Sequence, residues 1–233
     1  MPLPTDPNTP DDNYQGPARL FPLPDLVVFP HVVQPLHVFE PRYRALLDDA
    51  MRDDRLIAMA LLQPGWESEY EGRPPIDSLV CVGQVIARSE LDDGRSNLLL
   101  LGRRRAHVVA ELPPNRPFRQ AEVELLADCY PTEAASQRPT LQRRLTEQFR
   151  ELLQGSRQME EQLDQLLSGQ VPLGTLTDVV GHTLDLSHAV KRQLFAELDV
   201  DRRAEKLLEE LAQLAEDPSR ALRHGFPMQF SDN

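Results

Sequence analysis

Hydrophobic and polar positions between residues 36 and 51 predict a strand that runs directly into a helix. Residues 36–40 alternate between two faces with a period of two, as extended segments do. Pro41 follows, and its fixed φ and missing N–H suit the first position of a helix. Apolar residues then recur at helical spacing and form one stripe: Tyr43, Leu46, Leu47, Ala50 and Met51. This unit needs a sheet to cover, so we expect its neighbours to be strands.

Further strands are predicted on both sides of this unit. Segment 19–31 is extended, but Pro22, Pro24 and Pro30 restrict it to edges, ends or bulges of a sheet. The apolar run 56–62 indicates a strand that is buried on both faces. Other strands are expected at 79–87 with a bulge at Gly83, at 97–101 ending at Gly102, at 105–112 and at 118–126, with a hairpin turn at Asp92-Asp93-Gly94. Many strands, one helix and short returns favour a small barrel or pseudo-barrel.

The pattern becomes helical after Tyr130-Pro131 and stays so up to residue 217. Expected helices are 140–154 capped by Thr140, 159–167, a helix opened by a capping box of Thr175 and Asp178, one capped by Ser187, and one capped by Asp201 and stopped by Pro218. Short connections between them indicate a helical bundle. We therefore expect a tail over 1–17, a β domain over 18–130, a helical bundle over 131–217 and a second tail over 218–233.

The charge of the chain limits the classes of partner. The 233 residues carry a formal net charge of −12, which repels phosphate backbones and anionic membranes. No window approaches the roughly 18 uninterrupted apolar residues of a membrane span. The first sixteen residues lack the basic start and apolar centre of a signal peptide. The expected location is therefore the cytoplasm, without membrane association.

Reactive motifs are missing from the sequence. It contains neither the Gly-x-x-x-x-Gly-Lys-Ser/Thr phosphate loop nor a Gly-x-Ser-x-Gly elbow. Cys81 and Cys129 look like small core residues, and without nearby histidines they do not match the spacing of a zinc site. Lys191 is expected to be solvated on a helix face, which argues against a serine–lysine dyad. We expect no enzyme activity, no cofactor and no metal.

Two groups of residues are candidates for binding. Trp66 and Tyr70 lie in the long polar loop 64–77, where they would anchor a ligand or fold back as a lid over the core. Arg103, Arg104 and Arg105 follow Gly102 at an expected hairpin, where an acidic peptide or a phosphate could dock, although a soluble turn is the simpler explanation. Acidic residues of the same loop would hold a cation or only face water: Glu67, Glu69 and Glu71.

Four stretches resemble one known family. Residues 36–46, the segment 20–30, the hairpin 93–105 and the helical stretch 184–208 are similar to the N-terminal, substrate-binding domain of Lon proteases, which is also found in cereblon. The similarity covers about residues 18–214. It implies an α+β fold, in which a PUA-like β pseudo-barrel with one inserted helix is followed by a C-terminal helical bundle. The ATPase and peptidase modules of Lon have no counterpart in this sequence, which suggests a stand-alone domain.

The resemblance implies a function in protein binding. The leading hypothesis is a non-enzymatic module that holds protein or unfolded polypeptide segments, as an adaptor or recognition factor in protein quality control. Weak self-association is a further option. One alternative is a nucleic-acid-binding PUA-like protein, which the charge disfavours. Another is an uncharacterised enzyme that uses the loop 64–77.

Overall fold

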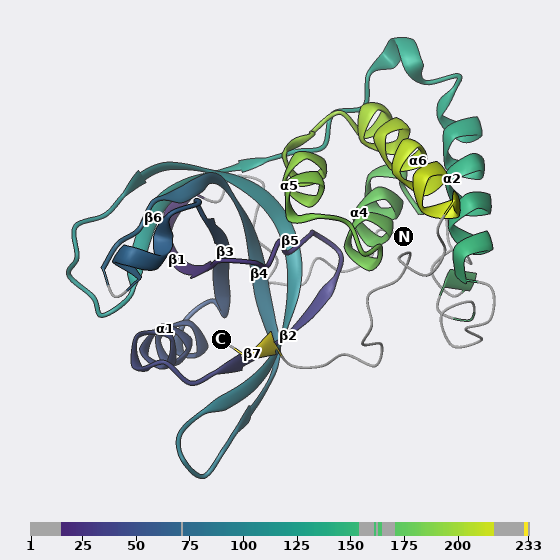
Figure 1. The fold of residues 1–233 in the computed structure, drawn as a ribbon. Coiled ribbons are helices and arrows are strands. Elements are labelled where there is room, and N and C mark those ends of the chain that lie inside the picture. Colours follow the sequence, from purple (N-terminus) through teal and green to yellow (C-terminus); the bar gives the residue numbers. More distant parts are fainter. Residues whose placement is uncertain are drawn as a thin grey trace, which may run out of the picture. The chain divides into compact units, whose positions relative to one another are not determined.

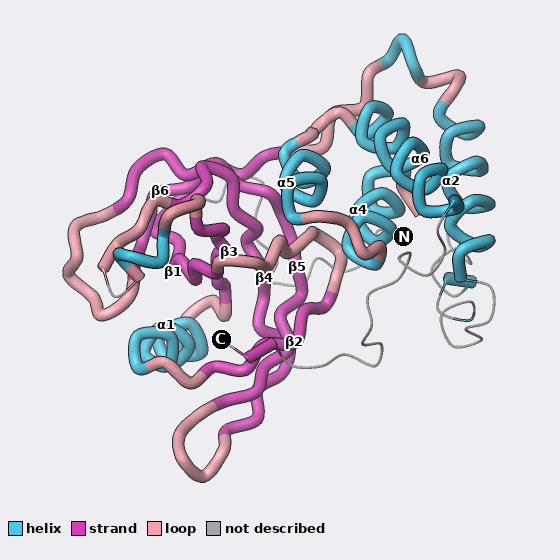
Figure 2. Tube along the Cα trace, in the orientation of Figure 1, coloured by secondary structure: helices cyan, strands magenta, loops and turns pink. Residues whose placement is uncertain are grey.

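The chain divides into two compact units. The computed structural model describes residues 15–70, 72–153, 161, 163–164, 171–216 and 231–232. One unit contains the residues up to Ala127 together with those from Gly225, and the other runs from Asp128 to His224. The described part of the first is mainly strand and that of the second is mainly helix (Figure 1, Figure 2). The mixed α+β class predicted from the sequence is confirmed. The expected tails lie almost wholly outside the described residues, except that the first strand already begins at Gln15 and a short strand is formed by Ser231–Asp232.

The β unit is built on one curled sheet. Its strands are β1 Gln15–Leu23, β2 Val33–Val38, β3 Leu56–Leu62, β4 Ile76–Glu90, β5 Ser96–Glu111, β6 Arg119–Leu126 and β7 Ser231–Asp232. The order is β4-β3-β1-β6-β5-β2-β7, and β4 also pairs with β5. Hydrogen bonding therefore closes a ring through five strands, while β2 and β7 extend from the first half of β5. Register shifts interrupt the pairing of β4 with β5, so the ring is a pseudo-barrel and not a regular barrel.

Small apolar side chains fill the interior of this ring. Alanine and valine dominate the buried cluster, which lets five strands close around a narrow core: Ala18, Leu20, Leu56, Ala58, Ala60, Val80, Val82, Ala106, Ala121 and Val123. Helix α1, Pro41–Arg52, has Pro41 at its start and lies against β1 and β3 (Figure 1). It buries four residues of the predicted stripe: Tyr43, Leu46, Leu47 and Ala50. The predicted strand–helix unit and the buried strand 56–62 are both confirmed.

Strand β1 lies between β3 and β6 in the sheet although it contains two prolines, Pro17 and Pro22. It pairs antiparallel with β6 through Gln15–Leu20 and parallel with β3 through Leu20–Leu23. Pro17 is therefore paired only on the β6 side, and Pro22 only on the β3 side. A missing N–H costs little where a strand has a neighbour on one side, so both prolines are tolerated.

Strand β5 passes straight through Gly102, so the expected strand end at this glycine was wrong. The segment before β2 crosses β5 here, because Gly102 N donates to Val32 O at 2.9 Å and His31 N donates to Gly102 O at 2.8 Å. A Cβ atom at Gly102 would lie 2.1 Å from the carbonyl oxygen of Phe29. The glycine therefore admits a close backbone crossing. The hairpin turn predicted at Gly94, with φ +76°, is confirmed.

The second unit is helical. Its helices are α2 Arg138–Leu153, α4 Leu173–Thr183, α5 His188–Ala196 and α6 Val200–Glu216, and α6 packs against the other three. The predicted helix 159–167 falls mostly outside the described residues. No helix among the described residues is long and apolar enough to cross a membrane.

Helix starts were predicted with mixed success. Ser187 Oγ accepts from Val190 N and caps α5, as expected. The caps proposed at Thr140 and Thr175 were wrong, because both residues lie inside helices that begin two residues earlier. Asp201 also lies inside its helix. The cap of α6 is instead Asp199, whose Oδ1 accepts hydrogen bonds from the backbone N–H groups of Asp201 and Arg202.

Arg203 occupies the centre of a polar cluster inside the helical unit. Its side chain is fully buried. Nη1 and Nη2 donate to the two carboxylate oxygens of Asp128 at 3.1 and 2.7 Å. Nε donates to Thr177 Oγ1 at 2.8 Å and lies 3.7 Å from Asp178 Oδ1. Nη1 also donates to the carbonyl oxygen of Glu197 at 2.8 Å. Several acceptors thus compensate one buried cation.

Two other sequence expectations fail in detail. Lys191 is not solvated: its side chain is buried, and Nζ donates to the carbonyl oxygen of His182 at 2.9 Å. Cys81 is a core residue as predicted, but Cys129 is exposed.

Candidate functional site

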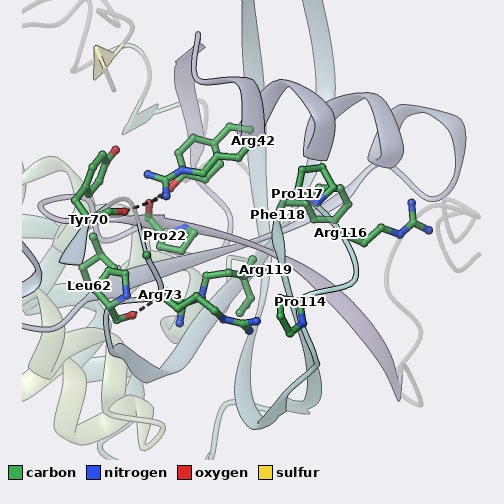
Figure 3. A pocket seen from close by; sticks show the side chains of 14 residues that line it. Pro22, Arg42, Leu62, Tyr70, Arg73, Pro114, Arg116, Pro117, Phe118 and Arg119 are labelled. Carbon is green, nitrogen blue, oxygen red and sulfur yellow. Dashed lines mark hydrogen bonds between the residues drawn. The ribbon is translucent and has the colours of Figure 1, made fainter.

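A cavity of about 140 Å³ opens in the β unit, and we call it the arginine cavity (Figure 3). Residues from β1, α1, β3, the loop 63–75, the loop 112–118 and the start of β6 line it. They are four arginines, two tyrosines, one phenylalanine, four prolines, two leucines and a glycine: Arg42, Arg73, Arg116, Arg119, Tyr43, Tyr70, Phe118, Pro22, Pro74, Pro114, Pro117, Leu20, Leu62 and Gly72.

Tyr70 fastens the loop 63–75 to the start of α1. Its hydroxyl donates to Glu40 Oε1. Its carbonyl oxygen accepts a hydrogen bond from Arg42 Nη1 at 3.0 Å, which Figure 3 shows. The Arg42 guanidinium also lies 4.7 Å from the centre of the Tyr70 ring. Burial, together with the hydrogen bond to the Glu40 carboxylate, raises the pKa of Tyr70. Trp66 meets the Tyr70 ring edge-on at 5.4 Å, so the two predicted aromatics form one pair.

Arg42 connects this loop to the strand–helix unit. Its guanidinium lies 4.9 Å from the centre of the Tyr43 ring, and its Nε donates to Glu40 Oε2 at 2.9 Å. Burial by itself lowers the pKa of Arg42, but its neighbours Tyr43 and Glu40 outweigh burial and raise the pKa. Arg42 is thus a permanent cation that holds one wall of the cavity together.

Arg73 and Arg119 share one carboxylate. Arg119 donates to both oxygens of Glu111, at 2.9 and 2.5 Å, and Arg73 Nη2 donates to Glu111 Oε2 at 2.7 Å. Burial would raise the pKa of Glu111, yet the hydrogen bonds from the two arginines lower it. Arg119 Nη1 further donates to the carbonyl oxygen of Pro74 at 2.8 Å, which fixes the end of the loop 63–75. Two cations and one anion leave an excess positive charge beside the cavity.

Arg116 is turned toward the helix. Its Nη1 donates to Asp49 Oδ1 at 2.9 Å, and the Asp49 carboxylate also accepts from Arg19 Nε at 2.7 Å. In Figure 3 the guanidinium of Arg116 points away from the other labelled side chains. Its aliphatic stem therefore lines the cavity, while its charge lies outside it.

The structure separates the two groups of candidate residues. Tyr70 lines the cavity, and Trp66 packs edge-on against the Tyr70 ring. Their role, as ligand anchors or as a lid over the core, stays a prediction. The turn location of Arg103, Arg104 and Arg105 was wrong, because they lie within β5 and none of them lines the arginine cavity. Arg103 Nε donates to Gln84 Oε1 at 3.1 Å, and Arg105 is buried. Their role in binding stays a prediction.

The cation site considered for the acidic loop residues falls largely outside the described side chains and stays a prediction. Glu67 is exposed, and the side chains of Glu69 and Glu71 lie outside the described residues. No group of three or more metal-binding side chains occurs in the described part of the chain. The sequence reasoning missed the arginines at 42, 73 and 119. Their only signal is that arginine recurs beside proline in both loops, in Gly72-Arg-Pro74 and in residues 113–119.

A family model described as the ATP-dependent protease La (LON) substrate-binding domain matches residues 18–213. Lon protease 2 of Desulfotalea psychrophila is 30% identical over 201 residues, and the Lon protease of Azospirillum brasilense is 28% identical over 195 residues. These matches cover 84% and 82% of this chain but only 25% and 23% of the relatives, so the chain spans about a quarter of their length.

Two solved structures share the fold. The N-terminal domain of the Mycobacterium avium complex Lon protease has a TM-score of 0.67 at 21% identity, covering 84% of this chain and 98% of that one. A Lon N-terminal domain protein from Xanthomonas campestris has a TM-score of 0.56 at 23% identity, covering 83% and 98%. With a family model that matches most of its length, this chain belongs to the LON substrate-binding domain family.

Proposed function

We propose that this protein binds polypeptide segments without altering them covalently, as a recognition or adaptor module in protein quality control. The observation that carries the proposal is the family match over residues 18–213, whose description is a substrate-binding domain.

The arginine cavity and its aromatic rim supply contacts suited to a polypeptide. Rings and proline faces, such as those of Tyr70, Phe118 and Pro22, bury apolar side chains at little entropic cost. Trp66 extends this surface, since it packs edge-on against Tyr70. We propose Trp66 and Tyr70 as binding residues.

Binding of a permanently unfolded polypeptide tests the proposal. A reduced and alkylated, fluorescently labelled protein should bind saturably at micromolar concentration, as measured by fluorescence anisotropy. A Trp66→Ala/Tyr70→Ala variant should bind at least about tenfold more weakly, because aromatic anchors carry much of the energy of such interfaces.

Phe39→Ala is the matched control, because Phe39 is an exposed aromatic of the same unit that does not line the cavity. It should bind like the unmodified protein. Absence of binding at high micromolar concentration would refute the function. If both variants weaken polypeptide binding equally, Trp66 and Tyr70 are not specific binding residues.

A further inference from the structure

The lining of the arginine cavity carries a charge opposite to that of the chain. The whole protein has a formal net charge of −12, yet the lining contains four arginines and no acidic residue. Arg116 directs its charge to Asp49 outside the cavity and Arg42 is paired with Glu40, so the excess charge comes from Arg73 and Arg119. Glu111 must serve both Arg73 and Arg119, so the pair of cations is only half neutralised. Such a site attracts an anionic group in spite of the overall acidity.

Arg73 has hydrogen-bonding capacity left for a ligand. Within the described part of the chain, both of its hydrogen bonds are made by Nη2, to Glu111 Oε2 and to Leu112 O. Its Nε and Nη1 hydrogens are not used there. About a third of the Arg73 side chain is exposed, at 34%, compared with 11% for Arg119. A guanidinium with unused donors is well suited to a carboxylate.

The size and walls of the cavity narrow the ligand further. A volume of about 140 Å³ is well below the ~300–1,000 Å³ of pockets that enclose drug-sized molecules, so it suits a single side chain or chain terminus. The remaining wall is apolar, with Phe118, Tyr70 and Pro22 facing the cavity. The ligand should therefore present an anionic group next to an apolar one.

We propose that the arginine cavity binds a carboxylate of a polypeptide segment, with Arg73 as the residue that contacts it and an adjacent apolar side chain against Phe118 and Tyr70. This inference rests on the proposed function, since it names the class of segment that the protein holds. The carboxylate comes from an acidic side chain or from the C-terminus of the segment, which the experiment distinguishes.

Two twelve-residue peptides test the inference by isothermal titration with the whole protein. Both are amidated at the C-terminus and differ only at a central residue between two leucines, which is Glu in one and Gln in the other. We expect the Glu peptide to bind about tenfold more tightly at low salt, as a charge-assisted hydrogen bond warrants. A third peptide, the Gln sequence with a free C-terminus, shows whether a terminal carboxylate serves equally.

Arg73→Gln should abolish the preference for the Glu peptide, and Arg73→Lys should retain part of it. Both substitutions leave Glu111 paired with Arg119, so the fold is preserved. Arg95→Gln, an exposed arginine of the β4–β5 turn, is the control with the same change of charge and should keep the full preference.

Equal binding of all three peptides overturns the inference but leaves the proposed function standing. An unchanged preference in Arg73→Gln places the carboxylate elsewhere and also overturns it. Failure of every peptide, together with failure of the unfolded polypeptide, refutes both the function and the inference.

Discussion

Arg203 shows how much the helical unit depends on a single buried cation. The guanidinium is enclosed by Asp128, Asp178, Thr177 and the carbonyl oxygen of Glu197. Burying an ion pair gives little net stability, but removal of one partner leaves the other charge buried without compensation. Removing Arg203 alone should therefore lower the free energy of unfolding by much more than the complete cluster adds to it.

We predict that Arg203→Met lowers the free energy of unfolding by about 3 kcal/mol or more, because the Asp128 and Asp178 carboxylates lose their shared cation. Urea unfolding followed by circular dichroism measures this. Arg202→Met is the matched control: that side chain is 74% exposed, and its ion pair with Asp199 is 3.6 Å long, so its cost should stay within about 0.5 kcal/mol. Similar costs for the two variants would contradict the account of the cluster.

Acidic pH should weaken the β unit through Asp49 and Glu111. The hydrogen bond from Arg19 lowers the pKa of Asp49, while the two arginines lower that of Glu111 against the effect of burial. A carboxyl group whose pKa is lower in the folded state stabilises the fold at any pH above its unfolded-state pKa, which is about 4. This contribution is lost as the pH falls through the folded-state pKa. The free energy of unfolding should therefore decrease below about pH 4.

Glu111→Gln should make this decrease shallower, because one of the two carboxyl groups that cause it is removed. Glu67→Gln, at an exposed loop position, should leave the decrease unchanged. Urea unfolding at a series of pH values provides the comparison. A pH dependence that Glu111→Gln leaves as steep as before would count against the Arg73–Glu111–Arg119 pairing.

Buried polar residues were the part of the sequence that resisted prediction. Lys191, Asp178 and Arg203 occur in helices where charged residues usually face water, and nothing in their spacing separates them from solvated neighbours such as Arg202. Apolar periodicity locates the core, but partners for a buried charge come from other helices. The sequence therefore predicts the apolar stripes and misses the polar cluster.

At the scale of elements, β5 holds the β unit together. It pairs with β2, β4 and β6, and it accommodates the crossing segment at Gly102. The sequence suggested two strands broken at this glycine, because a strand interior rarely favours glycine. Close approach of another backbone explains the residue instead, and a contact of that kind leaves no local signal.

Gly102→Ala should destabilise the protein by about 2 kcal/mol or more, since the new Cβ would lie 2.1 Å from the backbone oxygen of Phe29. Gly83→Ala is the comparison, because its nearest neighbour is a side-chain atom of Leu100 at 2.8 Å and not a backbone atom. We expect a cost of about 1 kcal/mol there. Thermal unfolding distinguishes the two, and a harmless Gly102→Ala would disprove the close crossing.

Helix capping provides a second test of elements. Ser187→Ala should lower stability by about 0.5–1 kcal/mol, because Ser187 Oγ caps Val190 N. Thr175→Ala should leave stability unchanged or slightly raised, since Thr175 lies inside α4, where alanine is the better helix former. Urea midpoints of the two variants measure both effects. The reverse order would restore the capping box inferred from the sequence.

At the scale of the whole molecule, fold and site differ in how far the sequence predicts them. Period-two and helical patterns were enough for the α+β fold, since each strand and helix carries its own signal. The arginine cavity joins residues that are distant in sequence, such as Pro22, Arg42, Arg73 and Phe118. Among the lining residues, only Tyr70 was a binding candidate from the sequence, because aromatics in a loop are conspicuous and paired arginines are not.

Net charge also acts at this scale. With a formal charge of −12, the protein should repel acidic polypeptides at long range and bind them only at the cavity. Salt screens both effects, so affinity for an acidic segment reflects their balance. The location of the contact is therefore more informative than the affinity itself.

Hydrogen–deuterium exchange of the whole protein, with and without a saturating unfolded polypeptide, shows whether polypeptides bind at the arginine cavity. Bound polypeptide should slow exchange in the segments 63–75 and 112–119, which contribute lining residues to the cavity. Saturable binding that leaves exchange in both segments unchanged would contradict binding at the cavity.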